Sequence, residues 1–274
     1  MIEELRHFLL VVEHGTVTEA ARHAHLSQPA LSASLKRLEE YFGAPLLFRG
    51  RAGATPTAAG MALVPRAEAV LAALGDARRA VAEIEGLSAG EVRVGASGTA
   101  ATYLLPEPLA RFRKLHPDVR IVLRELSARR AAADVERGEL DLAVVSDPGG
   151  ELWMRDEFVL VGSRKVHTPD APMITFSTDT TTRQNLDRHF PDANIVMELG
   201  SIAAVKRHVR AGIGIALLSR AAVQADLDAK RLVVVKSDKT PIPRELRLVH
   251  RGRELLSPAA AALRALLLER QKKR

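Results

Sequence analysis

The side chains best suited to binding another molecule lie between residues 27 and 37, in a segment rich in hydroxyl, amide and cationic groups. Amides and hydroxyls can hydrogen-bond to base edges in a DNA groove, and lysine and arginine can bind phosphates. The polar side of this segment consists of Gln28, Ser32, Ser34, Lys36 and Arg37. This combination makes the segment a candidate for nucleic-acid recognition.

Local signals predict that the same segment is a helix. Ser27 is a preferred N-cap residue, and Pro29 falls in the first turn, where proline is tolerated. Gly43 is placed to end the helix. The apolar residues at helical spacing, which we expect to face the core, are Leu31, Leu35, Leu38 and Phe42.

A shorter helix is predicted directly before this one, with a tight turn at His25 and Leu26 between the two. Its apolar face carries Val17, Ala20, Ala21 and Ala24. The small Ala20 and Ala21 allow the two helices to approach closely. Residues 15–43 therefore predict a helix-turn-helix, preceded by a helix over residues 2–14. The alternative is an ordinary helical hairpin with a solvated polar face.

Two short extended segments follow, over residues 46–48 and 54–57, and they are joined through Gly50 and Gly53. They predict a two-stranded wing with Arg49 and Arg51 at its tip, close to the DNA backbone or minor groove. The alternative is a plain basic loop.

Composition and charge limit the function classes. A chain of 274 residues is long enough for two or more domains, and the absence of cysteine excludes disulfides, thiol catalysis and cysteine-ligated metal. The net charge of +7 carries no argument for DNA binding, because residues 1–86 sum to −1. No signal peptide and no run long enough to span a bilayer is recognised, so we expect a cytoplasmic protein without membrane contact.

An alanine-rich helix is predicted from residue 58 to about residue 85. Its apolar residues alternate in steps of four and three, which is a heptad seam that can pair two helices: Leu63, Ala67, Val70, Leu74, Ala77, Val81 and Ile84. A helix packed against its own domain would show a similar stripe. The pairing interpretation is favoured because no neighbouring domain is predicted to cover this helix.

Strands and helices alternate beyond residue 88, which indicates α/β layers with mainly parallel strands. The order repeats after about residue 160. Crossings near residues 159–161 and 246–249 would join two similar halves, and a helix over residues 258–270 would return to the first half. The pattern predicts an α/β fold with two subdomains and a cleft between them, formed by residues 88–160 with 250–274 and by residues 161–249.

Ligands of open α/β sheets bind where strands end and helices begin. Candidate ligand-binding residues at such places are Ser97, Gly98, Thr99, Ala100, Thr102, Ser146, Asp147, Thr181, Arg183, Gly200 and Ser201. Hydroxyls, backbone N–H groups and one guanidinium suit a small carboxylate or similar anion. No acid–base pair, activated nucleophile or metal-ligand cluster is found, so neither catalytic residues, nor a cofactor, nor a metal site is predicted.

The chain resembles the LysR-type transcriptional regulators. The N-terminal matches are Leu5, Phe8, Val12, Gly15, Ala20-Ala21, Ser27-Gln28-Pro29-Ala30-Leu31-Ser32, Leu38-Glu39, Gly43, Pro45-Leu46, Arg49 and Thr57-Ala58-Ala59-Gly60. Looser matches follow at Glu91-Val92-Arg93-Val94-Gly95, Leu105-Pro106, Phe112, His116-Pro117, Leu140-Asp141-Leu142-Ala143 and 209–216. The resemblance covers most of the chain.

The resemblance implies a winged helix-turn-helix over residues 1–57, a dimerising linker helix over 58–87 and an effector-binding domain over 88–274 that is similar to periplasmic solute-binding proteins. It implies double-stranded DNA and a small-molecule effector as partners, a homodimer assembling into a homotetramer, and RNA polymerase as a further partner. A cytoplasmic solute-binding protein without regulatory activity is the alternative; the 86 leading residues argue against it.

The interpretation assigns two roles on the DNA side. Gln28, Pro29, Ser32 and Ala33 are expected nearest the bases, and Ser27, Ser34, Lys36, Arg37, Arg49 and Arg51 are expected to hold the backbone. Three departures from the family pattern bear on these expectations. Ala33 stands where arginine is frequent, Pro56 replaces an apolar residue in the wing, and residues 149–170 form a short stretch beside the cleft.

Overall fold

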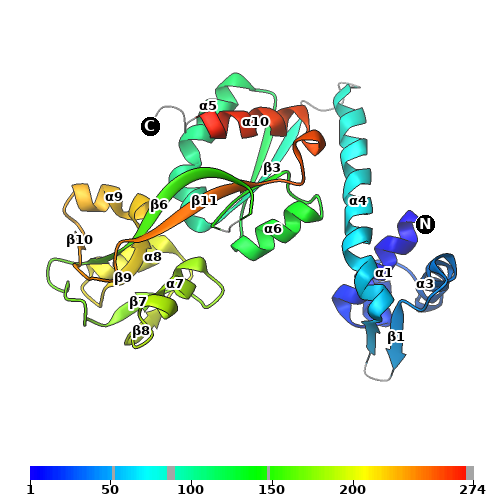
Figure 1. Ribbon diagram of the computed structural model, residues 1–274, viewed down its shortest axis with the longest axis horizontal. Coiled ribbons are helices and arrows are strands. Elements are labelled where there is room, and N and C mark those ends of the chain that lie inside the picture. The colour runs from blue at the N-terminus through cyan, green and yellow to red at the C-terminus, as the bar shows by residue number, and fades with distance from the viewer. Residues whose placement is uncertain (51–52, 85–89, 147–148, 270–274) are drawn as a thin grey trace. The chain divides into compact units, whose positions relative to one another are not determined.

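The computed structural model describes residues 1–50, 53–84, 90–146 and 149–269 (Figure 1). It divides into two compact units, Met1–Ala82 with Glu136–Glu139, and Glu83–Val135 with Leu140–Arg274. We describe the first as the helical unit and the second as the α/β unit, each by itself.

The helical unit begins with three helices at the predicted places: α1 (Ile2–His14), α2 (Val17–His23) and α3 (Gln28–Phe42). Local capping explains their sharp ends. The Ser27 hydroxyl accepts a hydrogen bond from the Ala30 N–H (3.3 Å), and Gly43 ends α3 in the left-handed conformation. The helix-turn-helix is therefore confirmed.

The wing is also present. Strand β1 (Leu47–Gly50) pairs in antiparallel register with β2 (Gly53–Pro56), and Arg49 lies opposite Ala54. Arg51, which was expected at the tip, lies outside the described residues. Helix α4 (Ala58–Ile84) follows and continues through Pro65.

Two predictions about the faces of α3 were wrong. Phe42 is 44% exposed and packs edge-on against Tyr41, because the core ends one turn earlier at Leu38. Ser34 is buried, because it lies three residues after Leu31 and four before Leu38 and so shares their inner face. Its hydroxyl lies 2.7 Å from His7 Nδ1.

The predicted seam of α4 divides into two parts. Leu63 and Ala67 pack into the core of the helical unit with residues of α1 and α3. Val70 and Val81 are exposed, at 44% and 60%. The first part of the stripe therefore belongs to the core of this unit, whereas Val70 and Val81 in the later part lie on its surface.

The same helix also corrects the expectation about membrane spans. By length and composition alone, Ala58–Gly75 is apolar enough to cross a membrane, with a mean hydropathy of 1.3. Some of the apolar side chains in this segment, Leu63 and Ala67, are buried in the core of the helical unit.

The α/β unit is built around a seven-stranded sheet (Figure 1). In its first half, β3 (Glu91–Ala96) pairs in parallel with β4 (Arg120–Glu125) and with β5 (Leu142–Val145). Helices of this half are α5 (Pro106–Leu115), α6 (Ala128–Glu136) and α10 (Pro258–Glu269), with a π-helix, η1 (Ala100–Leu104), after β3 and a 3-10 helix, η2 (Arg253–Leu255), before α10.

The second half contains a small parallel pair, β7 (Met173–Thr175) and β8 (Ile195–Glu198), and three helices, α7 (Thr181–His189), α8 (Ile202–Arg210) and α9 (Arg220–Asp228). Strands β9 (Ala216–Ser219) and β10 (Val233–Val234) both pair with β6. Of these elements, α9 and β10 were not predicted, and β9 starts three residues and ends two residues later than expected.

Two long antiparallel strands, β6 (Glu151–Gly162) and β11 (Ile242–Val249), run through both halves and form the crossings (Figure 1). Strand β6 starts seven residues before the predicted Phe158, so most of the short stretch 149–170 is strand. Because these two strands are antiparallel, the sheet is mixed rather than mainly parallel. Separate cores lie on the two sides, around Trp153 in the first half and around Phe158 and Ile174 in the second.

A cluster of cations surrounds Glu151 at the beginning of β6. Its carboxylate accepts hydrogen bonds from Arg264 and from Arg253 (2.6 Å), and lies 3.2 Å from His250 Nε2. The hydrogen bonds from Arg264 above all hold the pKa of Glu151 at about 2, below its ordinary 4.5.

We expect Glu151→Gln to lower the free energy of unfolding of the α/β unit at pH 7 by about 1–3 kcal/mol. Because folding lowers this pKa, the contribution is complete above pH 4.5 and is lost as the pH falls from there through about 2. Urea denaturation between pH 7 and 3 measures it. Glu254→Gln, which removes an exposed negative charge nearby, is the matched control. Equal losses of unfolding free energy in both variants at pH 7 would refute the assignment.

Candidate DNA interface and ligand cleft

The beginning of α3 presents small and polar side chains on the surface. Ser27, Gln28, Pro29 and Ala33 are exposed, and Ser32 is half-buried. Backbone N–H groups at a helix N-terminus and side chains of this kind suit contact with a DNA groove and its phosphates. Ser34 is the exception among the predicted residues, since its hydroxyl is buried against His7.

Three of the predicted phosphate-binding cations lie in the described residues; they are exposed, and each lies near a carboxylate. Lys36 Nζ lies 3.6 Å from Glu40, and Arg37 Nε donates to Glu4 at 3.2 Å. Arg49 Nη2 donates to Glu39 at 2.9 Å. Exposed ion pairs of this type contribute little to the free energy of folding, so DNA phosphates can replace the carboxylates at low cost.

Glu39 was not predicted as a functional residue, yet it connects α3 to the wing. Its Oε1 accepts hydrogen bonds from the N–H groups of Leu46 (2.9 Å) and Leu47 (3.3 Å), and its Oε2 accepts from Arg49. The sequence signals were an acidic residue in the last turn of the predicted helix and the match of Leu38-Glu39 to the family pattern. Glu39 thereby fixes the orientation of the wing and of Arg49 relative to α3.

Replacement of Glu39 by alanine should weaken DNA binding and lower the free energy of unfolding of the helical unit by about 1–3 kcal/mol, because two backbone N–H groups lose their acceptor. Glu39→Gln keeps an acceptor oxygen and removes only the ion pair, so we expect a smaller loss. Hydrogen exchange of the wing peptides, compared between the two variants, measures the difference. Indistinguishable exchange in both variants would contradict the positioning role.

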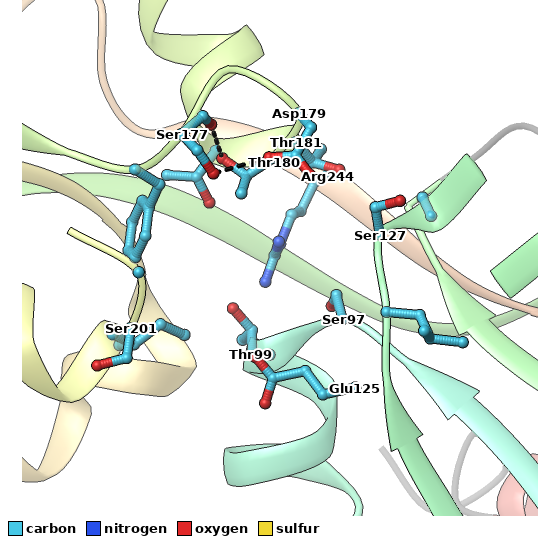
Figure 2. A pocket seen from close by; sticks show the side chains of 17 residues that line it. Ser97, Thr99, Glu125, Ser127, Ser177, Asp179, Thr180, Thr181, Ser201 and Arg244 are labelled. Carbon is cyan, nitrogen blue, oxygen red and sulfur yellow. Dashed lines mark hydrogen bonds between the residues drawn. The ribbon is translucent and has the colours of Figure 1, made fainter. Parts of the chain in front are cut away.

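The α/β unit contains a cavity of about 280 Å³ between its two halves (Figure 2). Loops after β3, β4, β7 and β8 converge on it, and β11 forms its floor. Six predicted ligand-binding residues line it: Ser97, Gly98, Thr99, Thr181, Gly200 and Ser201. The loops at the strand ends were thus correctly expected to form one pocket, which is the geometry of ligand sites in open α/β folds.

Four other predicted residues do not line this cavity. Ala100 is fully buried inside η1, whereas Thr102 on the same element is exposed. Ser146 directly follows β5, which pairs with β3, and its hydroxyl is buried with no hydrogen-bond partner among the described residues. Arg183 is held by Asp187 (2.8 Å), Glu198 and the Phe176 carbonyl, and the two carboxylates raise its pKa. Asp147 lies outside the described residues.

Arg244 on β11 is the main cavity residue that was missed. Its side chain is only 7% exposed, and its Nε donates to Asp156 Oδ2 on β6 at 2.8 Å. Nη2 lies 2.7 Å from the same oxygen but has no acceptor in hydrogen-bonding alignment. The Phe158 ring supports the guanidinium, 4.4 Å from Cζ. The available signal was an arginine two residues before the crossing predicted near residues 246–249.

Several donors remain available to a bound molecule. Figure 2 shows the Arg244 guanidinium directed into the space beside Ser97 and Thr99. Ser97 Oγ is buried and has no hydrogen-bond partner. Helices α7 and α8 begin at the edge of the cavity, where Thr180 and Ser201 each cap one N–H group. Buried donors without acceptors are costly, so this arrangement favours a ligand that supplies acceptor oxygens.

Comparison with known proteins places both units in one family. Residues 2–61 match the model of a bacterial regulatory helix-turn-helix protein, lysR family, and residues 85–272 match the LysR substrate binding domain. Similar relatives include a "Probable RuBisCO transcriptional regulator" of Nostoc sp., 31% identical over 95% of this chain and 86% of the relative. One of the same description from Gracilaria tenuistipitata is 30% identical over 94% and 93%.

Solved structures share the fold. CbnR, a LysR family transcriptional regulator, aligns over 100% of both chains with a TM-score of 0.65 and 18% identity. LysG from Corynebacterium glutamicum with bound effector Arg aligns over 98% of this chain and 97% of that chain, with a TM-score of 0.65 and 16% identity. Vibrio fischeri DarR in complex with DNA aligns over 98% of each, with a TM-score of 0.58 and 19% identity.

Proposed function

Since the chain belongs to the LysR family of transcriptional regulators, with a helix-turn-helix and an effector-binding domain, we propose which of its residues bind DNA and which kind of effector it binds. The observation that carries the proposal on the effector is the cavity with Arg244 on its floor and the unpartnered Ser97 hydroxyl beside it. Nothing in the comparisons favours the alternative of a solute-binding protein without regulatory activity.

On the DNA side, we propose that α3 enters the major groove with Gln28, Pro29, Ser32 and Ala33 nearest the bases. Ser27, Lys36, Arg37 and Arg49 would hold the phosphates, with Arg51 as a further predicted contact. The exposure of the first turns of α3 and of the three described cations, Lys36, Arg37 and Arg49, supports this assignment. Base contacts then determine sequence preference, and phosphate contacts determine affinity and its dependence on salt.

We propose that the exposed later part of the α4 seam, including Val70 and Val81, pairs two chains. A two-fold dimer binds two half-sites separated by about one helical turn (~34 Å) or a multiple of it. A tetramer made of two such dimers and a contact with RNA polymerase remain predictions from the family resemblance, and a cytoplasmic location remains a prediction from the sequence.

The effector would place an anionic group against Arg244, Ser97 and Thr99. A carboxylate suits these donors because a guanidinium and a hydroxyl give charge-assisted hydrogen bonds to its oxygens. Binding between the two halves can change the DNA-bound arrangement only if the ligand has different affinities for two states of the protein.

Calorimetry with a panel of small organic acids and amino acids tests the site. We expect at least one ligand to bind, and Ser97→Ala to weaken that binding about tenfold. Ser146→Ala is the matched control, because its hydroxyl is equally buried and unpartnered but lies outside the cavity. Unchanged binding in Ser97→Ala, or equal loss in both variants, would contradict the proposed site.

A further inference from the structure

The charged side chains at the cavity carry a net negative charge. Arg244 is the cation on the floor, and Asp156 behind it neutralises its charge. Glu125 and Asp179 also line the cavity, so it has two further carboxylates and, among the described lining residues, no second cation. A ligand that carries only negative charge would meet these carboxylates as well as the donors.

Glu125 is placed by a close contact with Gly98. A Cβ atom at position 98 would lie 2.7 Å from Glu125 Oε1, so the absence of a side chain at Gly98 allows the carboxylate to lie there. Within the part of the chain that the structure describes, Glu125 forms neither a hydrogen bond nor an ion pair, and it does not reach Arg244. Figure 2 shows it on the same side of the cavity as Thr99.

The cavity therefore contains two kinds of group that lack a partner. Arg244 and Ser97 offer donors without acceptors, and Glu125 offers an acceptor without a donor. Asp179 contributes a second carboxylate, which accepts a hydrogen bond from Ser177 Oγ at 2.7 Å. A ligand with an anionic group for the donors and an ammonium group for Glu125 satisfies both with charge-assisted hydrogen bonds.

We propose that the effector is a small zwitterion of the amino-acid class, with its carboxylate at Arg244 and Ser97 and its ammonium group at Glu125. This inference rests on the proposed function, since it names the chemistry of the effector at that same cavity. A cavity of about 280 Å³ has room for a molecule of this size. Glu125 is then the residue that distinguishes an amino acid from the corresponding plain acid, because the plain acid leaves this carboxylate unpaired.

Calorimetry on the full chain tests the inference with the twenty protein amino acids and, for each, the carboxylic acid that lacks the amino group. We expect at least one amino acid to bind ten or more times more tightly than its plain acid. Glu125→Gln should weaken binding of that amino acid about tenfold and leave or improve binding of the plain acid. Glu254→Gln, which removes an exposed negative charge outside the cavity, should change binding of neither the amino acid nor the plain acid.

The outcomes separate this inference from the proposed function. If a plain acid binds as tightly as its amino acid, or if Glu125→Gln leaves their ratio unchanged, the zwitterion inference is wrong, although an anion site at Arg244 stands. If neither class binds, the proposed site fails as well. Thermal unfolding of Glu125→Gln shows that the variant is folded, which the exposure of this side chain leads us to expect.

Discussion

Gly60→Ala is expected to destabilise the helical unit by about 2–3 kcal/mol and to abolish most DNA binding, although alanine is the better helix former by about 1 kcal/mol. Gly60 lies in the first turn of α4, where its N–H donates to Thr57 Oγ1 at 3.0 Å. A Cβ atom there would lie 2.1 Å from the Leu46 carbonyl oxygen and 3.1 Å from Pro56 Cβ. Both neighbours belong to the wing region, so backbone would have to move.

The Leu46 carbonyl cannot yield easily, because it already accepts from the Thr57 N–H at 3.0 Å, while the Thr57 hydroxyl donates to the Pro45 carbonyl at 2.8 Å. Hydrogen exchange of peptides from α1 to α3 measures stability of the helical unit inside the full chain. Ala69→Gly, at an exposed position of the same helix, calibrates the propensity effect alone. Slower exchange in Gly60→Ala than in the wild type would show that the close contact does not exist.

Arg244→Leu is expected to eliminate effector binding and to lower the free energy of unfolding of the α/β unit by about 3–5 kcal/mol, since removing one partner of a buried ion pair leaves the other charge uncompensated. The Asp156 side chain is only 5% exposed. It keeps hydrogen bonds from Ser219 Oγ (2.7 Å) and the Ala221 N–H (3.4 Å), but no cation remains beside it.

The double variant Arg244→Leu/Asp156→Asn separates the two effects. The double variant no longer buries the Asp156 charge. We expect it to regain most of the lost stability, because a neutral amide costs less to bury than an unpaired carboxylate. Effector binding should remain absent, since the donors of Arg244 are still missing. Urea denaturation and calorimetry measure the two quantities. Wild-type stability of Arg244→Leu, or retained effector binding, would refute the role assigned to this pair.

Prediction from sequence succeeded where the determinants are local. The start of α3 follows from its Ser27 cap, and the ends of α1 and α3 follow from Gly15 and Gly43, which accept a positive φ; these signals act within one turn of the chain. The loops at the ends of β3, β7 and β8 were expected to meet because parallel strands bring their carboxyl ends to one edge. Six of the predicted ligand residues accordingly line one cavity.

Prediction from sequence failed where the position of a side chain depends on a residue that is distant in the sequence. Ser34 looked like a surface residue, but helical spacing places it with Leu31 and Leu38, and His7 from another helix satisfies its hydroxyl. Arg183 was expected at the ligand, yet Asp187 and Glu198 hold it elsewhere. Arg244 acquires its role only because Asp156, 88 residues away, and Phe158 orient it.

The most direct test of the account is selection of random DNA duplexes by the full-length wild-type chain and by its Gln28→Ala and Lys36→Ala variants. We predict that the wild type enriches a two-fold symmetric sequence, that Gln28→Ala loses preference at specific base pairs, and that Lys36→Ala retains the sequence with uniformly weaker, less salt-dependent binding. The account is contradicted if the wild type enriches no sequence, or if Gln28→Ala weakens binding equally to all duplexes.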